Sequence, residues 1–339
     1  MHAVVRRFRT TIVEGRFISL LASLGIIGMR GALFVWGNKP PVTFTDSSFL
    51  WRYIGHFFTD PLMSLIASTL SVFLIAWIIS AMNSRFNLIR SRSNLPFVAP
   101  LFLLSLHPWF LMMSGDYIAI ILILLAFFPL LRSYQNPVAY LFSFRTGVLI
   151  AVASLFQVFA LTLVPLWWRG EQSMRGAQFR AFLSSLFAVF LVYITLISVY
   201  LLSDDVAGFL HPFLSFSAIS LPAIPGFSIQ EWGTVILVAL FFISNMILSI
   251  KTYARDKVLT LTLMQFVVFV IIFLLLLQVV YWTETVFFLT LGIALISYLN
   301  AYFYTKTVST TNVYLAYTMV GLMLLIYLSH FPPFQLLLP

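Results

Sequence analysis

Residues 259–280 read LTLTLMQFVVFVIIFLLLLQVV, without a single charged side chain. A helix needs about 20 consecutive apolar residues to cross the hydrocarbon core of a bilayer, and this stretch is long enough. Backbone amides find no water partners in lipid, so we expect it to be helical. The pattern recurs in ten apolar segments: 17–36, 61–82, 96–114, 117–131, 146–168, 181–202, 232–250, 259–280, 285–304 and 313–330.

The composition supports the same class of protein. Hydrophobic residues make up 61% of the 339 residues and charged residues only 9%, whereas about a quarter of the residues in a soluble domain are charged. No long polar or Pro/Gly/Ser-rich stretch separates the segments, so we expect one integral-membrane domain over 1–339. The absence of cysteine excludes disulfides, thiolate metal sites and a cysteine nucleophile.

The net charge of +9 follows the loops, which points to membrane orientation and not to a nucleic-acid partner. Four arginines precede the first segment, which we interpret as a retained signal anchor with a cytoplasmic N-terminus. Lys and Arg concentrate in cytoplasmic loops of membrane proteins. If all ten segments crossed, however, the basic loops at 169–180 and 251–258 would lie outside.

One segment must therefore fail to cross. If 146–168 enters and leaves on the cytoplasmic side as two short helices, hinged near Ser154 and Gln157, all Lys and Arg except Arg30, Lys39 and Arg52 lie inside. This arrangement predicts about nine crossings, one re-entrant segment and an external C-terminus. The alternative places the short segment 117–131 as the one that does not cross. In either arrangement we expect a multi-pass membrane protein with a cytoplasmic N-terminus.

The first external loop, residues 37–60, carries the most informative polar pattern. Leu50, Tyr53, Ile54 and Phe57 recur at helical spacing, which predicts an amphipathic helix lying flat at the interface. Another face of that helix carries Arg52, His56 and Asp60. Asp46 can accept hydrogen bonds from the first amides of this helix, and Asp60 precedes Pro61 as an N-cap does. Capping is thus the structural interpretation of both aspartates, and catalysis is the functional one.

The remaining carboxylates have an ordinary interpretation as solvated turn or cap residues: Asp116, Asp204, Asp205, Glu231 and Glu284. Within the segments, Arg30 is expected to snorkel to the interface. His107 precedes Pro108, so its side chain is expected to hydrogen-bond to the backbone that a kink frees. Gln157, like the other amide side chains inside segments, is expected to join helices by hydrogen bonds.

No nucleotide-binding, metalloprotease or serine-hydrolase motif is present, and the five histidines are scattered. No cofactor is evident, although a Mg²⁺ or Mn²⁺ bound by carboxylates on the outer face stays open.

Residues 81–90, AMNSRFNLIR, followed by Ser93-Asn94-Leu95-Pro96 and the apolar run through Leu131, resemble an uncharacterised family of polytopic inner-membrane proteins of Bacteroidota. The likeness covers about residues 60–200. The same loop is similar to multi-span capsular and exopolysaccharide polymerases, which implies a role in cell-envelope glycans.

Residues 146–157, TGVLIAVASLFQ, and the apolar run to Pro165 are similar to a segment of integral-membrane glycosyltransferases that use polyprenyl-phosphate sugars. Those enzymes carry a catalytic Asp or Glu in the first external loop beside an interfacial helix. The resemblance therefore implies Asp46 and Asp60 as catalytic candidates. The chain departs from that pattern because no paired acidic motif occurs in this loop.

Two functions follow as hypotheses. In the first, the protein is a glycosyltransferase or polymerase-like enzyme with a lipid-linked sugar as substrate. Asp46 would then act as the general base, with Arg52 and His56 contacting phosphate and Asp116 contacting substrate. In the second, the protein is a non-catalytic scaffold, a subunit of an envelope assembly, or a transporter of lipid or polymer.

Overall fold

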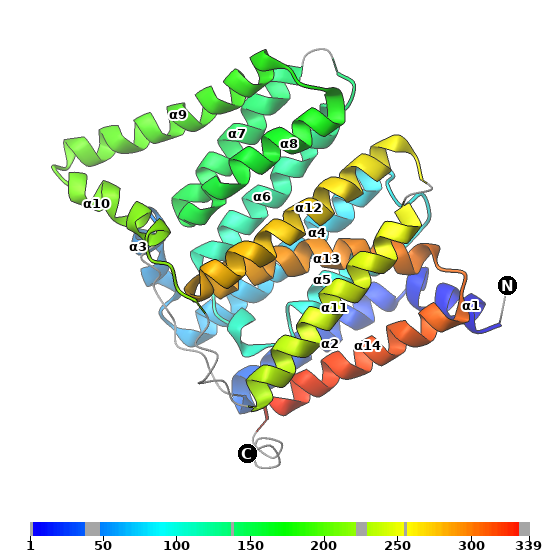
Figure 1. Cartoon of the computed structure of the whole chain (residues 1–339). Helices are drawn as coiled ribbons and strands as arrows, with labels where there is room; N and C mark the ends of the chain where they lie inside the picture. Colours follow the sequence, from blue (N-terminus) through cyan, green and yellow to red (C-terminus); the bar gives the residue numbers. More distant parts are fainter. Residues whose placement is uncertain (1–2, 38–47, 137–138, 222–228, 254–255, 332–339) are drawn as a thin grey trace.

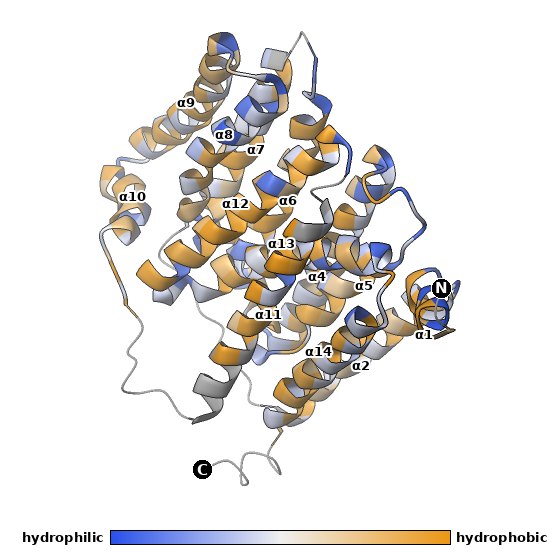
Figure 2. Cartoon of the chain, turned by 45° about the vertical axis from the view of Figure 1, so that its right-hand side comes forward, coloured by the Kyte–Doolittle hydropathy of each residue, from blue (hydrophilic) through white to orange (hydrophobic). Residues whose placement is uncertain are grey.

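The computed structural model describes residues 3–37, 48–136, 139–221, 229–253 and 256–331. These residues form a bundle of helices that run side by side between two ends (Figure 1), and no named β-strand occurs among them. Seven helices are long and apolar enough to cross a membrane. Figure 2 shows that the helix bodies are apolar and that hydrophilic residues gather near their ends. The all-α, polytopic fold predicted from the sequence is confirmed.

The first half of the chain forms α1 (Ala3–Phe8), the π-helix η1 (Arg9–Val13), α2 (Ile18–Trp36), α3 (Trp51–Ile54), η2 (Gly55–Phe58), α4 (Pro61–Phe86), α5 (Leu95–Leu103), η3 (Pro108–Phe110), α6 (Gly115–Arg132), α7 (Ala139–Phe156), η4 (Val158–Thr162) and α8 (Leu163–Arg175). The second half forms α9 (Phe179–Leu202), α10 (Val206–Leu210), η5 (His211–Phe216), α11 (Ile229–Tyr253), α12 (Val258–Val280), η7 (Trp282–Glu284), α13 (Thr285–Lys306) and α14 (Thr310–Ser329).

Connections that are far apart in the sequence meet at each end of the bundle. At one end, which we call the arginine end, the Asn94 amide donates to the Val13 carbonyl oxygen (2.8 Å), and the Ser93 and Thr305 hydroxyl groups lie 2.7 Å apart. At the other, the carboxylate end, α3 packs on the start of α6 and lies near α10 (Figure 1). This end carries Asp60, Asp116, Asp205 and Glu284.

Helices α7 and α8 form a hairpin that begins and ends at the arginine end. Arg175 at the end of α8 donates to the Ser143 hydroxyl near the start of α7 (2.6 Å), while the turn at Gln157 lies at the carboxylate end. The predicted doubling back of 146–168 is present, but the hairpin is longer than the predicted re-entrant segment, because its turn reaches the carboxylate end and both helices extend beyond that range. The rival is wrong, since α6 runs from one end to the other as a continuous helix.

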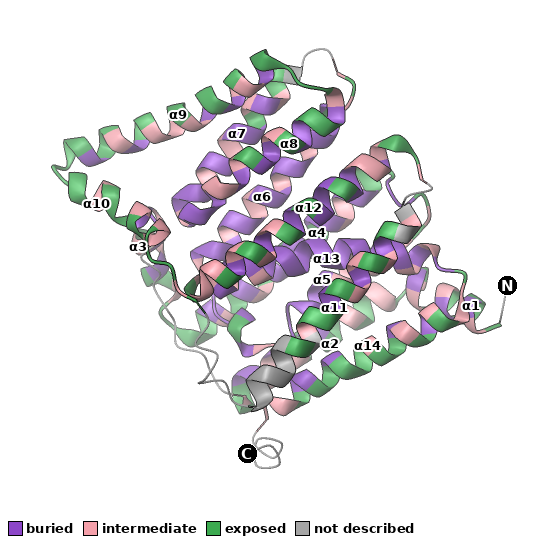
Figure 3. Cartoon of the chain, viewed as in Figure 1, coloured by how far each residue is buried: buried purple, intermediate pink, exposed green. Residues whose placement is uncertain are grey.

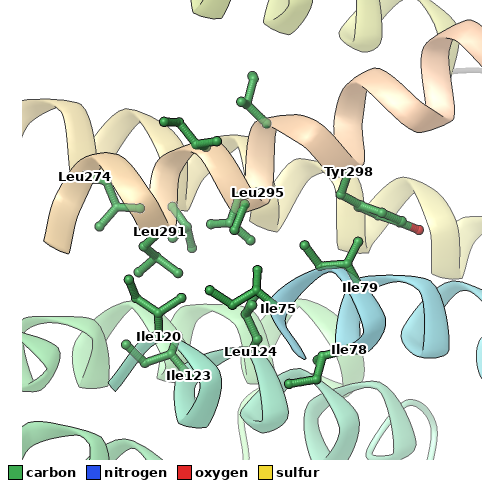
Figure 4. Packing of buried hydrophobic residues seen from close by; sticks show 14 of the residues in the cluster. Ile75, Ile78, Ile79, Ile120, Ile123, Leu124, Leu274, Leu291, Leu295 and Tyr298 are labelled. Atoms are coloured by element: carbon green, nitrogen blue, oxygen red, sulfur yellow. The ribbon is translucent and has the colours of Figure 1, made fainter. Parts of the chain in front are cut away.

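Helix α13 lies at the centre of the bundle and is buried along most of its length (Figure 3), whereas α2, α9 and α14 expose large apolar side chains. Leu291 and Leu295 of α13 pack against Ile75 of α4 and Ile120 of α6 (Figure 4). Apolar side chains on the exterior carry no free-energy cost in lipid. The arrangement of these helices therefore depends on packing and on buried hydrogen bonds.

The third apolar segment, 96–114, is not one kinked helix. Helix α5 ends at Leu103 and α6 begins at Gly115, with only the short turn η3 between them. The His107 side chain accepts a hydrogen bond through Nδ1 from the Trp109 amide (3.2 Å), which confirms its predicted role toward the backbone.

Arg30 does not snorkel, and that prediction is wrong. It is only 1% exposed, and its guanidinium donates four hydrogen bonds across the bundle. Nε and Nη2 donate to the hydroxyl groups of Thr69 (2.9 Å) and Ser68 (2.7 Å) in α4. Nη1 and Nη2 donate to the carbonyl oxygens of Leu104 (3.1 Å) and Phe110 (2.8 Å) in the non-helical stretch. Arg30 thus compensates for hydrogen bonds that a continuous helix would have made.

Replacing Arg30 by Met should destabilise the protein, because a methionine of similar length donates none of the four bonds. At about 0.6 kcal/mol per bond inside a membrane protein, the expected loss is roughly 2–3 kcal/mol. A thermal unfolding experiment in detergent should show this as a midpoint lower by roughly 5 °C or more. Arg180→Met, at an exposed position at the start of α9, is the control. An unchanged midpoint for Arg30→Met would contradict the role given to Arg30.

A second polar cluster lies at the arginine end. The Asp256 carboxylate accepts hydrogen bonds from Lys306 and from Tyr302 (2.5 Å), and pairs with Arg90 (3.3 Å). Burial alone raises the pKa of a carboxyl group, but hydrogen bonds from Lys306, Tyr302 and the Lys257 amide outweigh it and lower the pKa of Asp256 to about 2. This cluster ties the α11–α12 connection to α13.

The contribution of Asp256 should depend on pH. Its folded pKa lies below the unfolded value of about 3.9, so its charge stabilises the fold above about pH 4, and that contribution is lost as the pH falls toward 2. Asp256→Asn should therefore lower the unfolding midpoint at pH 6, and the difference from wild type should shrink between pH 4 and pH 3. Asp204→Asn, at the opposite end, is the control. A difference that stayed constant with pH would be inconsistent with an ionised Asp256.

Candidate functional site

Of the two catalytic candidates, Asp46 lies outside the described residues, and Asp60 has a structural role. The Asp60 carboxylate accepts a hydrogen bond from the Met63 amide (3.3 Å) as the N-cap of α4, and Pro61 occupies the first position of that helix. The capping interpretation of Asp60 is confirmed. Its side chain is exposed at the carboxylate end.

The predicted helix of the first external loop is present as two short pieces, α3 and η2. Trp51 is buried and stacks on Phe58 with ring centroids 5.6 Å apart. Two members of the predicted apolar face, Tyr53 and Phe57, are exposed on the surface of the chain, as expected of side chains that contact lipid. His56 is exposed on the same short element. The aromatic rings on both sides of this element are typical of a segment that lies at a membrane interface.

Arg52 joins this element to the end of α9. Its Nη2 donates to the hydroxyl groups of Tyr200 (2.6 Å) and Tyr53 (2.8 Å), and lies 3.7 Å from an Asp205 carboxylate oxygen. Asp205 also accepts a hydrogen bond from the Gly208 amide (2.8 Å), so the predicted cap role of Asp205 is confirmed. The guanidinium therefore sits among aromatic rings with one partly exposed counter-charge.

Asp116 belongs to a buried network that we call the carboxylate cluster: Asp116, Gln157 and Glu284. The Gln157 amide nitrogen donates to Asp116 Oδ1 and to Glu284 Oε2, both at 2.8 Å. Ser114 donates from its hydroxyl group to Asp116 Oδ2 (2.9 Å). Asp116 and Gln157 are buried, whereas Glu284 is partly exposed. One side-chain amide thus holds two carboxylates from distant parts of the sequence.

Close backbone packing places the members of this cluster. A Cβ atom at Gly115 would lie 2.8 Å from the Phe156 carbonyl oxygen and 3.0 Å from Trp51, so only glycine lets α6 begin this near the hairpin turn. The Leu155 carbonyl oxygen accepts hydrogen bonds from the amides of Phe49 and Leu50, both at 2.9 Å. The turn of the hairpin is therefore fastened to the first external loop, directly beside Gln157.

Aromatic side chains cover this region. Phe49 contacts four other rings, those of Tyr193, Tyr200, Phe209 and Phe213, at centroid distances of 5.4–6.4 Å. Phe159, two residues after Gln157, contacts the rings of Phe216, Tyr281 and Phe288. The carboxylate cluster thus lies where apolar and aromatic surface surrounds a few convergent polar groups, as in ligand sites generally.

The cluster can hold a hydroxyl group, because each carboxylate oxygen can accept a hydrogen bond from it. The amide oxygen of Gln157, Oε1, has no hydrogen-bond partner among the described residues. The described residues contain no group of three His, Asp or Glu side chains that could hold a metal ion.

Asp116 is a candidate from the sequence, and the structure places it beside Glu284, for which the sequence predicts only a turn or cap role. Glu284 follows Thr283 in a tight turn, where a solvated carboxylate is the ordinary expectation. The available signal was Gln157, a strongly polar side chain in the middle of an apolar segment. Its predicted role of joining helices is confirmed, and its partners are acidic.

Comparison of the chain with protein-family models, with curated proteins and with solved structures finds no match. A function for the chain must therefore be argued from its own residues.

Asp116 and Gln157 should be energetically coupled. Asp116→Ala and Gln157→Leu should each destabilise the protein by about 1–3 kcal/mol, because each leaves a buried polar partner without its hydrogen bond. In a double-mutant cycle measured by unfolding in detergent, the coupling energy should exceed about 0.5 kcal/mol. Asp60→Asn combined with Gln157→Leu is the control pair, and its effects should add. Additive effects for the first pair would show that the contact contributes nothing.

Proposed function

We propose that this integral-membrane protein is a glycosyltransferase that takes the sugar from a polyprenyl-phosphate donor at its carboxylate end. The observation that carries the proposal is the carboxylate cluster, a buried Asp116 and a partly exposed Glu284 bridged by one amide beneath an interfacial element. The two sequence resemblances give the substrate class. The exposed apolar surface of α3 and η2 supports a donor that arrives through the lipid.

In this proposal Glu284 is the general base, since it is the partly exposed member of the cluster. Its carboxylate removes the proton from an acceptor hydroxyl group, and the oxygen of that group attacks the anomeric carbon of the donor sugar. The bond between that carbon and the phosphate oxygen breaks, and its electron pair leaves with the polyprenyl phosphate. Asp116 is a positioning residue, because it fixes Gln157 and thereby Glu284.

Arg52 supports binding of the phosphate. It lies at the carboxylate end on the interfacial element, and its Nε is a buried donor without a partner among the described residues. A guanidinium binds phosphate through two parallel hydrogen bonds, which requires its Tyr200 or Asp205 partner to give way. Asp46 and His56 remain candidates from the sequence for the same site.

The test is release of decaprenyl phosphate in proteoliposomes from decaprenyl-phosphate donors that carry glucose, mannose or galactose. Glu284→Gln should reduce release by about 10²–10⁴-fold, the usual contribution of a general base, while binding of decaprenyl phosphate persists. Arg52→Gln should weaken that binding. Asp204→Asn removes an exposed carboxylate at the same end and is the matched control. Release by Glu284→Gln at the wild-type rate would refute its role as base.

Transport is the second candidate, and one observation favours it. The non-helical stretch 104–114 and the hairpin turn at Gln157 lie near the same buried polar groups, and transporters often bind their substrate where broken helices meet. Wild-type protein that moves a fluorescent decaprenyl phosphate between leaflets without releasing sugar from any donor would favour transport over transfer.

A further inference from the structure

A second site lies at the opposite end of the bundle, away from the carboxylate cluster. A groove of about 800 Å³ runs between α4 and α7, with α6 as its floor. Helix α6 packs against both α4 and α7 and holds them apart. Three arginines line the groove at the arginine end, one from each helix: Arg85, Arg132 and Arg145.

The three arginines carry charge that the rest of the described chain does not neutralise. All three are exposed, and none of them forms an ion pair with a described carboxylate. Arg85 and Arg132 occupy the last turns of α4 and α6, where a cation is favoured by the helix dipole. Arg145 lies in the second turn of α7, so the dipole gives no reason for its charge. A bound anion would explain all three.

The rest of the groove is apolar. Its walls include Trp77 and Ala81 of α4, Leu125 and Phe128 of α6, and Val148 of α7. Trp77 lies two helical turns from Arg85, about 12 Å along α4. The combination of clustered cations at one end with an apolar wall of this length fits a molecule with an anionic head and a hydrocarbon tail.

The apolar surface continues beyond the groove along α4. Leu74 and then Leu70 are exposed on the same helix. Leu74 is about 16 Å from Arg85 along the axis, which is about half the thickness of the hydrocarbon core and the depth that an acyl chain of one leaflet reaches. Basic pockets between transmembrane helices are sites where phospholipid head groups bind.

We propose that this groove binds one anionic phospholipid, with its phosphate between Arg85, Arg132 and Arg145 and its acyl chains along α4 and α6. The proposal does not depend on the transferase activity. The bound lipid links three helices that begin or end at the arginine end, so it also fastens the start of the α7–α8 hairpin to α4.

Native mass spectrometry of the full chain in detergent tests the proposal, with phosphatidylglycerol and phosphatidylcholine as probes. Wild type should bind one phosphatidylglycerol at least tenfold more tightly than phosphatidylcholine. Arg85→Gln, Arg132→Gln and Arg145→Gln combined should remove this preference. The matched control combines Arg16→Gln, Arg92→Gln and Arg180→Gln, which removes the same charge from exposed arginines outside the groove. It should keep the preference.

Ala81→Trp provides an independent test, because it fills the groove and leaves the three arginines in place. It should weaken phosphatidylglycerol binding several-fold. Three results would overturn the proposal: an equal loss of preference in the control triple variant, which indicates diffuse attraction; displacement of the lipid by inorganic phosphate, which indicates a site for a free anion; or unchanged binding in Ala81→Trp. The last two results need no arginine variant, so they decide the question even if the groove triple variant fails to fold.

Discussion

Backbone amides and carbonyl groups at membrane depth must find hydrogen-bond partners within the protein. Residues 104–114 form no α-helix, so their backbone groups need partners from other parts of the chain. Arg30 supplies donors for the carbonyl groups of this stretch. Hydroxyl groups on one face of α4 supply two further partners: Ser64 accepts from the Met113 amide (2.8 Å), and Ser68 donates to the Leu111 carbonyl oxygen. Helices α2 and α4 are therefore held against the break, and α6 begins where the break ends.

This break determines where the candidate site forms. Because the chain leaves the helical conformation after Leu103, Gly115 can begin α6 against the hairpin turn, and Asp116 in its first turn meets Gln157. The cluster thus depends on the same polar contacts that stabilise the irregular stretch.

The sequence predicted what hydropathy and charge distribution determine. The helical class and the doubling back of 146–168 follow from length and from the placement of Lys and Arg, and both are present, whereas segment 96–114 is a short α-helix followed by irregular backbone. The sequence did not predict that Arg30 is buried, because an arginine that snorkels and one that is buried give the same local pattern. The oxygens that accept its hydrogen bonds lie about 40–80 residues away. The spacing of Ser64, Ser68 and Ser71 on one face of α4 was the overlooked signal that this helix faces polar partners.

The candidate site was only partly accessible to the same reasoning. The position of Asp60 before Pro61 predicted an N-cap, and Asp60 is the N-cap of α4. Asp116 and Glu284 look equivalent to any turn carboxylate until the hairpin places Gln157 between them, which is a tertiary effect. The two ends then carry different groups: two carboxylates share the Gln157 amide at one end, whereas exposed arginines surround an apolar groove at the other. In the two proposals, the carboxylates therefore bind the hydroxyl group of an acceptor, and the arginines bind the phosphate of an anionic lipid.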